Sequence, residues 1–196
     1  QNRASKSKSA TKAAMSWPRS IKPFMSAAKI ENQQHNGYDM KEVKPPEDFR
    51  PYIGTAPSMF LAGSLEMGKA EDWQERIVSS LKHVNCVVLN PRRANWDASW
   101  EQSIDNPDFR GQVEWELDAL DAADHVVFYF APATKAPVTL LELGLRAAKR
   151  PDNIIVCCPD GYWRKGNVDI TCKRAGVCQV PDLQSLTREI VRRFAA

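Results

Sequence analysis

The segment that most constrains the fold is 124–149, where a strand pattern, a short loop and a helix pattern follow one another. Residues 125–130 are an unbroken run of β-branched and aromatic side chains, which is typical of a strand covered on both faces. Residues 131–137 contain two prolines and three alanines and cannot continue a strand. From Pro137 apolar side chains recur at helical spacing, and proline suits the first helical turn. These apolar residues are Val138, Leu141, Leu145 and Ala148.

One carboxylate, Glu142, lies close to the start of this predicted helix. A strand, loop and helix of this kind place it near the carboxyl edge of a parallel sheet, where open α/β proteins bind ligands. The unpaired N–H groups at the start of the helix favour an ionised side chain. The neighbours of Glu142 are apolar, so an ordinary wet helix face is not expected. Glu142 is therefore a candidate anionic nucleophile.

Strand and helix patterns alternate along the rest of the chain. The expected strands are 59–62, 86–89, 125–130, 153–158 and 177–180, and the expected helices are 70–81, 112–123, 137–148, 167–175 and 182–194. This alternation predicts an α/β fold, a doubly wound five-stranded parallel sheet of flavodoxin-like order 2-1-3-4-5 with helices on both faces. Strands one and three are neighbours in that order. The turn after the first strand and the helix of Glu142 would then face one crevice.

The chain of 196 residues, 43% of them apolar, predicts a single core. We expect residues 58–196 to form the domain and residues 1–57 to be an extended or disordered basic tail and linker. Residues 1–30 hold seven basic groups and no acid, whereas the remaining 166 residues hold 20 bases and 24 acids. The mildly acidic body removes the argument for a nucleic-acid partner. The expected location is cytoplasmic, or mitochondrial if the tail is a transit peptide.

The five cysteines are odd in number and lack CxxC spacing, which indicates small core residues in a reducing compartment. Three widely separated histidines argue against a zinc site, so we expect neither metal nor cofactor. No apolar run approaches the roughly 20 residues of a membrane span, so no membrane partner is expected.

The turn at 63–68 has two glycines but neither a GxGxxG pattern nor a Walker lysine. Its backbone N–H groups and the Ser64 hydroxyl could contact a phosphate or a sugar hydroxyl, or the glycines could serve only a tight turn. The following irregular segment, 92–110, is long enough to suggest a functional loop. Its Arg92 and Arg93 could hold a phosphate or pair with nearby acids, and Trp96 could stack on a base.

Glu142 and Glu116 are the two residues best suited to act as a catalytic pair. A positioned carboxylate can attack an oxocarbenium-like carbon, and a second carboxyl group can protonate the leaving group. On residue type alone, a single glutamate on a helix is most often a solvated charge.

Three sequence blocks resemble the nucleoside 2-deoxyribosyltransferase superfamily, and most closely its nucleoside 2-deoxyribosyltransferase-like branch. The blocks are MFLAGSL at 59–65, VEWEL at 113–117 leading into Ala123-Asp124, and LELG at 141–144. The resemblance spans roughly residues 58–175, and relatives include hydrolases of deoxynucleoside 5′-monophosphates.

The resemblance implies roles for particular residues. The family nucleophile falls on Glu142, and its acidic partner, usually aspartate, falls on Glu116. A tyrosine that orients the nucleophile is replaced by Phe60, and an aspartate that contacts the base is replaced near Ala136. The expected substrate-contacting residues are Phe60, Gly63, Ser64, Leu65, Met67, Gly68, Asn90, Arg92, Arg93 and Trp96.

These lines together predict cleavage or transfer of an N-glycosidic bond in a nucleoside or nucleotide through a glutamate nucleophile. A catalytically silent nucleotide-binding or signalling module of the same fold is the alternative, and a structural scaffold is a third possibility. The expected partners are the small-molecule substrate and further copies of the chain, in a homodimer or higher homo-oligomer.

Overall fold

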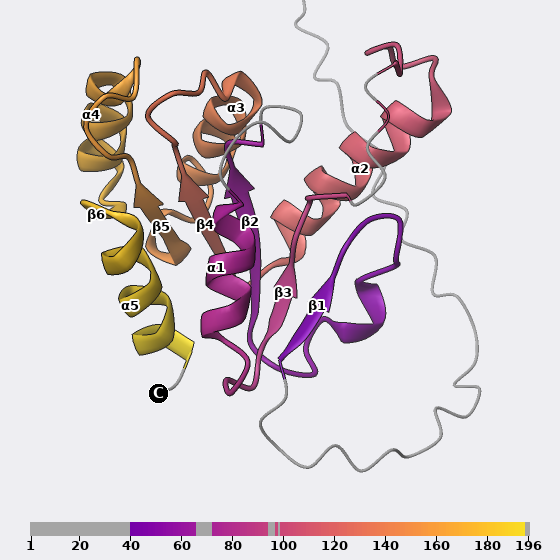
Figure 1. The fold of residues 1–196 in the computed structure, drawn as a ribbon, viewed down its shortest axis with the longest axis horizontal. Helices are drawn as coiled ribbons and strands as arrows, with labels where there is room; N and C mark the ends of the chain where they lie inside the picture. The colour runs from indigo at the N-terminus through magenta and orange to yellow at the C-terminus, as the bar shows by residue number, and fades with distance from the viewer. Residues whose placement is uncertain (1–39, 66–71, 94–96, 98, 195–196) are drawn as a thin grey trace, which may run out of the picture. The chain divides into compact units, whose positions relative to one another are not determined.

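The computed structural model describes residues 40–65, 72–93, 97 and 99–194. Its centre is a six-stranded sheet of order β1-β3-β2-β4-β5-β6 in which all neighbours run parallel (Figure 1). The strands are β1 (Lys41–Val43), β2 (Ser58–Gly63), β3 (Val87–Leu89), β4 (His125–Tyr129), β5 (Ile154–Cys157) and β6 (Cys178–Val180).

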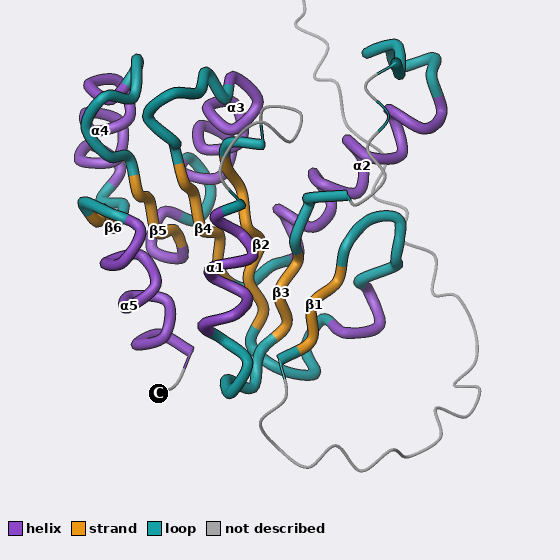
Figure 2. The backbone as a smooth tube through the Cα atoms, in the orientation of Figure 1, coloured by secondary structure: helices purple, strands orange, loops and turns teal. Residues whose placement is uncertain are grey.

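Helices cover both faces of the sheet (Figures 1 and 2). They are α1 (Trp73–Ser80), α2 (Pro107–Ala122), α3 (Pro137–Ala147), α4 (Lys165–Ala175) and α5 (Leu183–Phe194), with short 3₁₀ turns η1 (Arg50–Tyr52) and η3 (Pro151–Asn153). Successive strand residues point to opposite faces. In β2, Phe60 and Ala62 pack in the core layer of α2, α3 and α4, whereas Met59 and Leu61 pack in the layer of α1 and α5.

The prediction of a five-stranded sheet was wrong, because β1 adds a sixth strand beside β3. The five expected strands keep their relative order as β3-β2-β4-β5-β6. β1 lies in the segment 1–57 that we expected to be tail and linker. It is three residues long and only Val43 is buried, so it shows no strand periodicity in the sequence.

The helix expected at 112–123 begins earlier, at Pro107. The Asn106 side chain caps it by accepting hydrogen bonds from the N–H groups of Asp108 and Phe109. A proline at the helix start and Gly111 in the second turn obscure the helical pattern in the sequence. The expected inward residues of α1, which are Trp73, Ile77 and Leu81, are confirmed as fully buried.

The apolar side chains that reveal α3 in the sequence point mainly outward. Val138 is 58% exposed, Leu141 63% and Leu145 42%. The buried face carries Thr139, Glu142, Leu143, Arg146 and Ala147. The helix was predicted from its outer face, and two ionisable side chains occupy its inner face.

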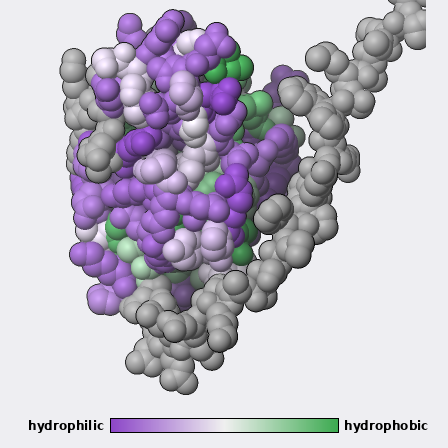
Figure 3. Space-filling view, turned by 90° about the vertical axis from the view of Figure 1, so that its right-hand side faces the viewer, coloured by the Kyte–Doolittle hydropathy of each residue, from purple (hydrophilic) through white to green (hydrophobic). Residues whose placement is uncertain are grey.

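The side of the molecule that carries β1 and α2 is mostly hydrophilic, with hydrophobic residues in small separate patches (Figure 3). Among the described residues, no helix is long and apolar enough to cross a bilayer. The main apolar layers therefore lie between the helices and the sheet.

Hydrogen bonds outside the strand ladder join the starts of β2 and β4. The N–H and hydroxyl of Ser58 donate to Asp124 Oδ2 at 2.9 and 2.8 Å, and the Asp124 N–H donates to the Ser58 hydroxyl at 3.1 Å. At the other end of the pair, Gly63 lies opposite Tyr129. A Cβ on Gly63 would lie 2.5 Å from the Trp73 ring and 2.6 Å from the Tyr129 carbonyl oxygen. Glycine is therefore required here by close approach.

Replacing Gly63 with alanine is expected to lower the free energy of unfolding by about 1–3 kcal/mol, because Trp73 or β4 must move to admit the methyl group. Gly144→Ala in α3 is the matched control, since no atom lies within 4 Å of its added Cβ. Helix propensity predicts that this control gains up to about 1 kcal/mol. Urea denaturation measures both variants, and wild-type stability of Gly63→Ala would contradict the close approach.

Candidate active site

Glu142 lies on the inner face of α3, in the second turn after the loop that follows β4. Only 6% of the residue is exposed. Burial and the charge of Glu116 both raise its pKa. No described residue donates a hydrogen bond to its carboxylate. Buried carboxylates normally have donors. Among the described residues, the hydrogen-bonding capacity of the Glu142 carboxylate is therefore not used.

Glu116 faces the same region from α2. Its carboxylate accepts a hydrogen bond of 2.8 Å from Nε2 of Gln112, one helical turn earlier. The same nitrogen donates to the carbonyl oxygen of Pro91 at 3.1 Å, just after β3. The structure thus brings the two glutamates together, and it adds Gln112, which the sequence reasoning missed. Its position four residues before Glu116 on one helix was the available signal.

Burial and mutual repulsion favour the protonated forms of this pair. Burial, and after it the nearby charge of Glu116, raise the pKa of Glu142 to about 8. Burial also raises the pKa of Glu116 to about 7, against the lowering effect of the Gln112 hydrogen bond. Two such close groups titrate as a pair. Around neutral pH the pair can hold one proton and one negative charge.

Arg146 fixes the spacing between the two helices that carry the glutamates. It lies one turn after Glu142 and is 1% exposed. Its guanidinium donates to the carbonyl oxygens of Leu120 at 2.9 Å and Ala123 at 2.7 Å, at the end of α2. The carbonyls at a helix C-terminus favour a cation. The sequence reasoning missed Arg146 because a single arginine in a helix usually lies on the surface.

The turn after β2 contacts the loop that leads into α3. The Ser64 hydroxyl lies 2.6 Å from the Thr134 hydroxyl and accepts a hydrogen bond of 3.0 Å from the Ala131 N–H. The Ser64 N–H donates to the Tyr129 carbonyl at 3.0 Å. Ser64 thus joins the ends of β2 and β4, and its own N–H and hydroxyl, which we expected to contact a substrate, are bonded within the protein.

The residues after β3 are held from several sides. Asn90 is buried, donates to Glu42 at 2.7 Å and accepts from the Arg92 N–H at 3.0 Å. Arg92 pairs with Asp72, the N-cap of α1, at 3.0 Å. Arg93 lies over the Trp100 ring, 5.0 Å from its centroid. This segment therefore lies between the start of α1 and the side of α2 that carries Gln112.

The other expected substrate contacts divide into three groups. Phe60 is fully buried in the core, beneath α2 and α3. Leu65 is half-buried at the end of the described part of its turn. Met67, Gly68 and Trp96 lie outside the described residues. Within the part of the chain that the structure describes, no group of three or more His, Cys, Asp or Glu side chains could hold a metal ion.

The fold, the buried Glu142 and the half-buried Glu116 define a parallel α/β protein with two neighbouring carboxyl groups between helices on one face of the sheet. The family described as nucleoside 2-deoxyribosyltransferase like matches residues 56–162, more than half of the chain, and the chain belongs to this family. The resemblance found in the sequence blocks is thereby confirmed. The family indicates a small-molecule, nucleoside-type partner in general terms.

The chain was also compared with solved structures and with curated proteins. A crystal structure of a conserved protein from Enterococcus faecalis is similar, with 16% identity and a TM-score of 0.47, covering 70% of this chain and 99% of that chain. No curated protein matches the chain.

The raised pKa values predict that stability falls as pH rises. The unfolded chain releases these protons near pH 4.5, whereas the folded pair retains them to about 7 and about 8, so unfolding becomes easier across this interval. Glu142→Gln removes one ionisable group. At about pH 9 we expect this variant to exceed wild type by on the order of 1–3 kcal/mol in unfolding free energy, with a much smaller gain at about pH 5.5.

Urea denaturation at the two pH values measures this difference. Glu189→Gln is the matched control, because hydrogen bonds from Arg192 and Arg193 lower the pKa of Glu189 to about 2. Its effect on stability should therefore be the same at both pH values. An equal effect of Glu142→Gln at both pH values would show that burial does not penalise the Glu142 charge.

Proposed function

We propose that the protein cleaves or transfers the N-glycosidic bond of a nucleoside or nucleotide, with Glu142 as the nucleophile. The observation that supports this most strongly is a buried carboxylate that faces a second carboxyl group and has no donor among the described residues. Membership of the nucleoside 2-deoxyribosyltransferase like family supports a nucleoside-type substrate.

The proposed reaction has two steps. A Glu142 oxygen attacks the anomeric carbon, the carbon–nitrogen bond breaks, and its electron pair leaves with the base, which takes the proton from Glu116. Glu116 then removes a proton from water, or from the nitrogen of a second base, which attacks the anomeric carbon and releases Glu142. Each carboxyl group thus returns to its starting state, with the configuration at the anomeric carbon retained.

The pair holds one proton and one negative charge between its two apparent pKa values, as the first step requires. Because the pKa of Glu142 is raised to about 8 and that of Glu116 to about 7, the proton lies mainly on Glu142, and the reactive form, with Glu142 ionised and Glu116 protonated, is the minor arrangement of this state. The Gln112 N–H bonded to Glu116 would stabilise the charge that appears there when the proton leaves.

A catalytically silent nucleotide-binding module is the second candidate. Phe60, where relatives often have a tyrosine, offers no hydroxyl to orient Glu142, and the Ser64 hydroxyl already bonds within the protein. Such a module would bind nucleosides or nucleotides without releasing base.

Incubation with ribo- and deoxyribonucleosides and their 5′-monophosphates, followed by chromatography of free base, tests the proposal. Wild type should release base, and Glu142→Ala should be inactive. Glu116→Gln should lose about 10²–10⁴-fold in rate with unactivated leaving groups. Glu189→Gln on α5 is the matched control and should retain full activity. Saturable binding without base release by wild type would favour the silent module.

The pH profile provides an independent prediction. kcat/KM should be bell-shaped, falling below about pH 7 and above about pH 8, because the reactive pair holds a single proton only in between. In Glu116→Gln the fall in residual activity above about pH 8 should disappear, since the group that supplies the proton has been replaced. An alkaline limb that stays in place in this variant would contradict a proton shared by the two glutamates.

A further inference from the structure

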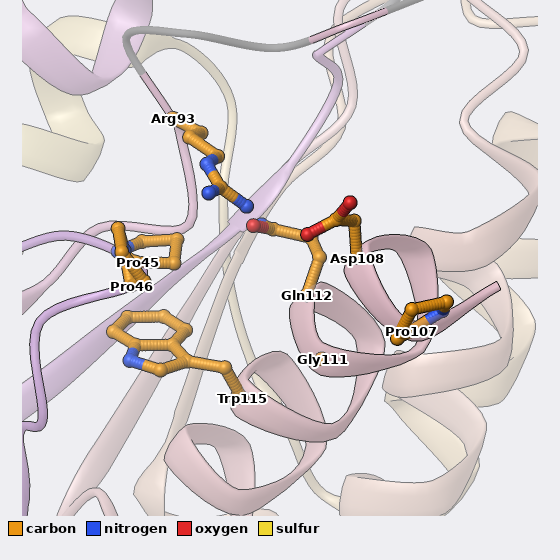
Figure 4. A pocket seen from close by; sticks show the side chains of 8 residues that line it. All are labelled: Pro45, Pro46, Arg93, Pro107, Asp108, Gly111, Gln112 and Trp115. Atoms are coloured by element: carbon orange, nitrogen blue, oxygen red, sulfur yellow. The ribbon is translucent and has the colours of Figure 1, made fainter. Parts of the chain in front are cut away.

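A cavity of about 180 Å³ is lined by Gln112, whose amide also donates to Glu116, while neither glutamate lines the cavity itself. Its walls come from α2, from Arg93 after β3, and from Pro45 and Pro46 after β1 (Figure 4). Pockets for drug-sized ligands measure about 300–1,000 Å³, so this cavity suits a fragment of a nucleotide rather than the whole molecule.

Gln112 presents an unused hydrogen-bond acceptor in this wall. Both partners of its Nε2 are acceptors, the Pro91 carbonyl and the Glu116 carboxylate, which fixes the orientation of the amide. Its Oε1 is buried and has no partner in the described part of the protein. The residue is only 3% exposed. A buried acceptor of this kind calls for an N–H or O–H donor from a ligand.

The charges in the cavity favour an uncharged ligand. The Arg93 guanidinium points toward Gln112, with the Asp108 carboxylate beside it (Figure 4). One cation and one anion leave the cavity neutral, which disfavours a phosphate. Arg93 can donate to a ligand carbonyl, whereas Asp108 and Gln112 Oε1 can accept from ligand N–H groups.

The remaining walls are flat and apolar. The Pro45 and Pro46 rings lie near the Trp115 indole (Figure 4). The indole is held in place by a hydrogen bond of 2.8 Å to the Glu47 carbonyl and by edge-on packing against Phe49 at 5.3 Å. Rigid flat surfaces of this kind suit a planar ring.

We propose that this cavity binds a nucleobase, specifically a heterocycle with N–H groups beside a carbonyl, such as guanine, hypoxanthine or uracil. The identification of this ligand as the base that leaves or accepts the sugar rests on the proposed function. Gln112 then contacts the base through Oε1 and Glu116 through Nε2, and it links base recognition to the proton donor.

Gly111 allows a test that leaves Gln112 and Glu116 intact. It lines the cavity, and no atom lies within 4 Å of a Cβ added there. Leucine at this position would fill the cavity while favouring the helix. Gly166→Leu is the matched control, since Gly166 is exposed on α4 and has equally open space.

Calorimetric titration of the whole protein with free guanine, hypoxanthine, uracil and adenine gives the readout. At least one carbonyl-bearing base should bind wild type about tenfold more tightly than adenine, which offers no oxygen to Arg93. Gly111→Leu should weaken that binding by at least about tenfold, and Gly166→Leu should not. Circular dichroism and urea denaturation confirm that both variants fold.

Two results overturn the cavity proposal: no base binds wild type, or Gly111→Leu binds base as tightly as wild type. Base release is measured separately on the same proteins. Base binding lost in Gly111→Leu, with no base release by wild type, would support the cavity and contradict the glycosidase. Base release and base binding that are both unaffected in Gly111→Leu would contradict the cavity and leave the glycosidase standing.

Discussion

The pairing of β2 with β4 is the constraint on which the candidate site depends. Both strands are central, so neither has a free edge, and polar contacts close the pair at both ends. Ser58 and Asp124 bond reciprocally where the strands begin, and Ser64 bonds to Ala131 and Thr134 where they end. The chain leaves β4 beside the end of β2 and turns directly into α3. The depth of Glu142 follows from this path.

Depth alone would not create a reactive pair, because two acidic side chains repel one another. Arg146 holds the two helices together against this repulsion, because its guanidinium on α3 donates to carbonyl oxygens at the end of α2. Among the described residues it makes no ion pair with either glutamate. A salt bridge to Glu142 would stabilise its charge and lower its pKa. Because the cation bonds to backbone instead, the helices are clamped while the carboxyl groups keep raised pKa values.

The sequence was sufficient to predict the central part of the fold. Strands such as 125–130 are long and apolar, and their alternation with helices determines a parallel sheet. β1 could not be found, since its three residues gain stability from β3 rather than from a pattern of their own. The inner face of α3 was also obscured, because Arg146 is stable there only through carbonyls of another helix. Sequence periodicity reports local pattern, and these features depend on distant partners.

Some residues of the candidate site could likewise be predicted from the sequence, and others could not. Glu142 and Glu116 could be proposed from sequence blocks, and in the structure they lie close enough for the charge of Glu116 to raise the pKa of Glu142. Ser64 was expected to meet a ligand, yet its hydrogen bonds close the sheet, a role that depends on Thr134 seventy residues later. Gln112 went unnoticed because glutamine in a helix carries no special signal. Its importance arises from Pro91, which the fold brings beside it.

The family match begins at residue 56, so β1 and the Pro45-Pro46 turn lie outside it. The carboxyl pair lies within the matched segment, whereas the cavity next to it is completed by residues that precede it. The two carboxyl groups that cleave a bond must keep nearly the same positions in every relative. The residues that contact the leaving group can differ from one substrate to another. If the two proposals hold, the matched segment supplies the chemistry, and the edge strand with its proline turn adapts it to a particular base.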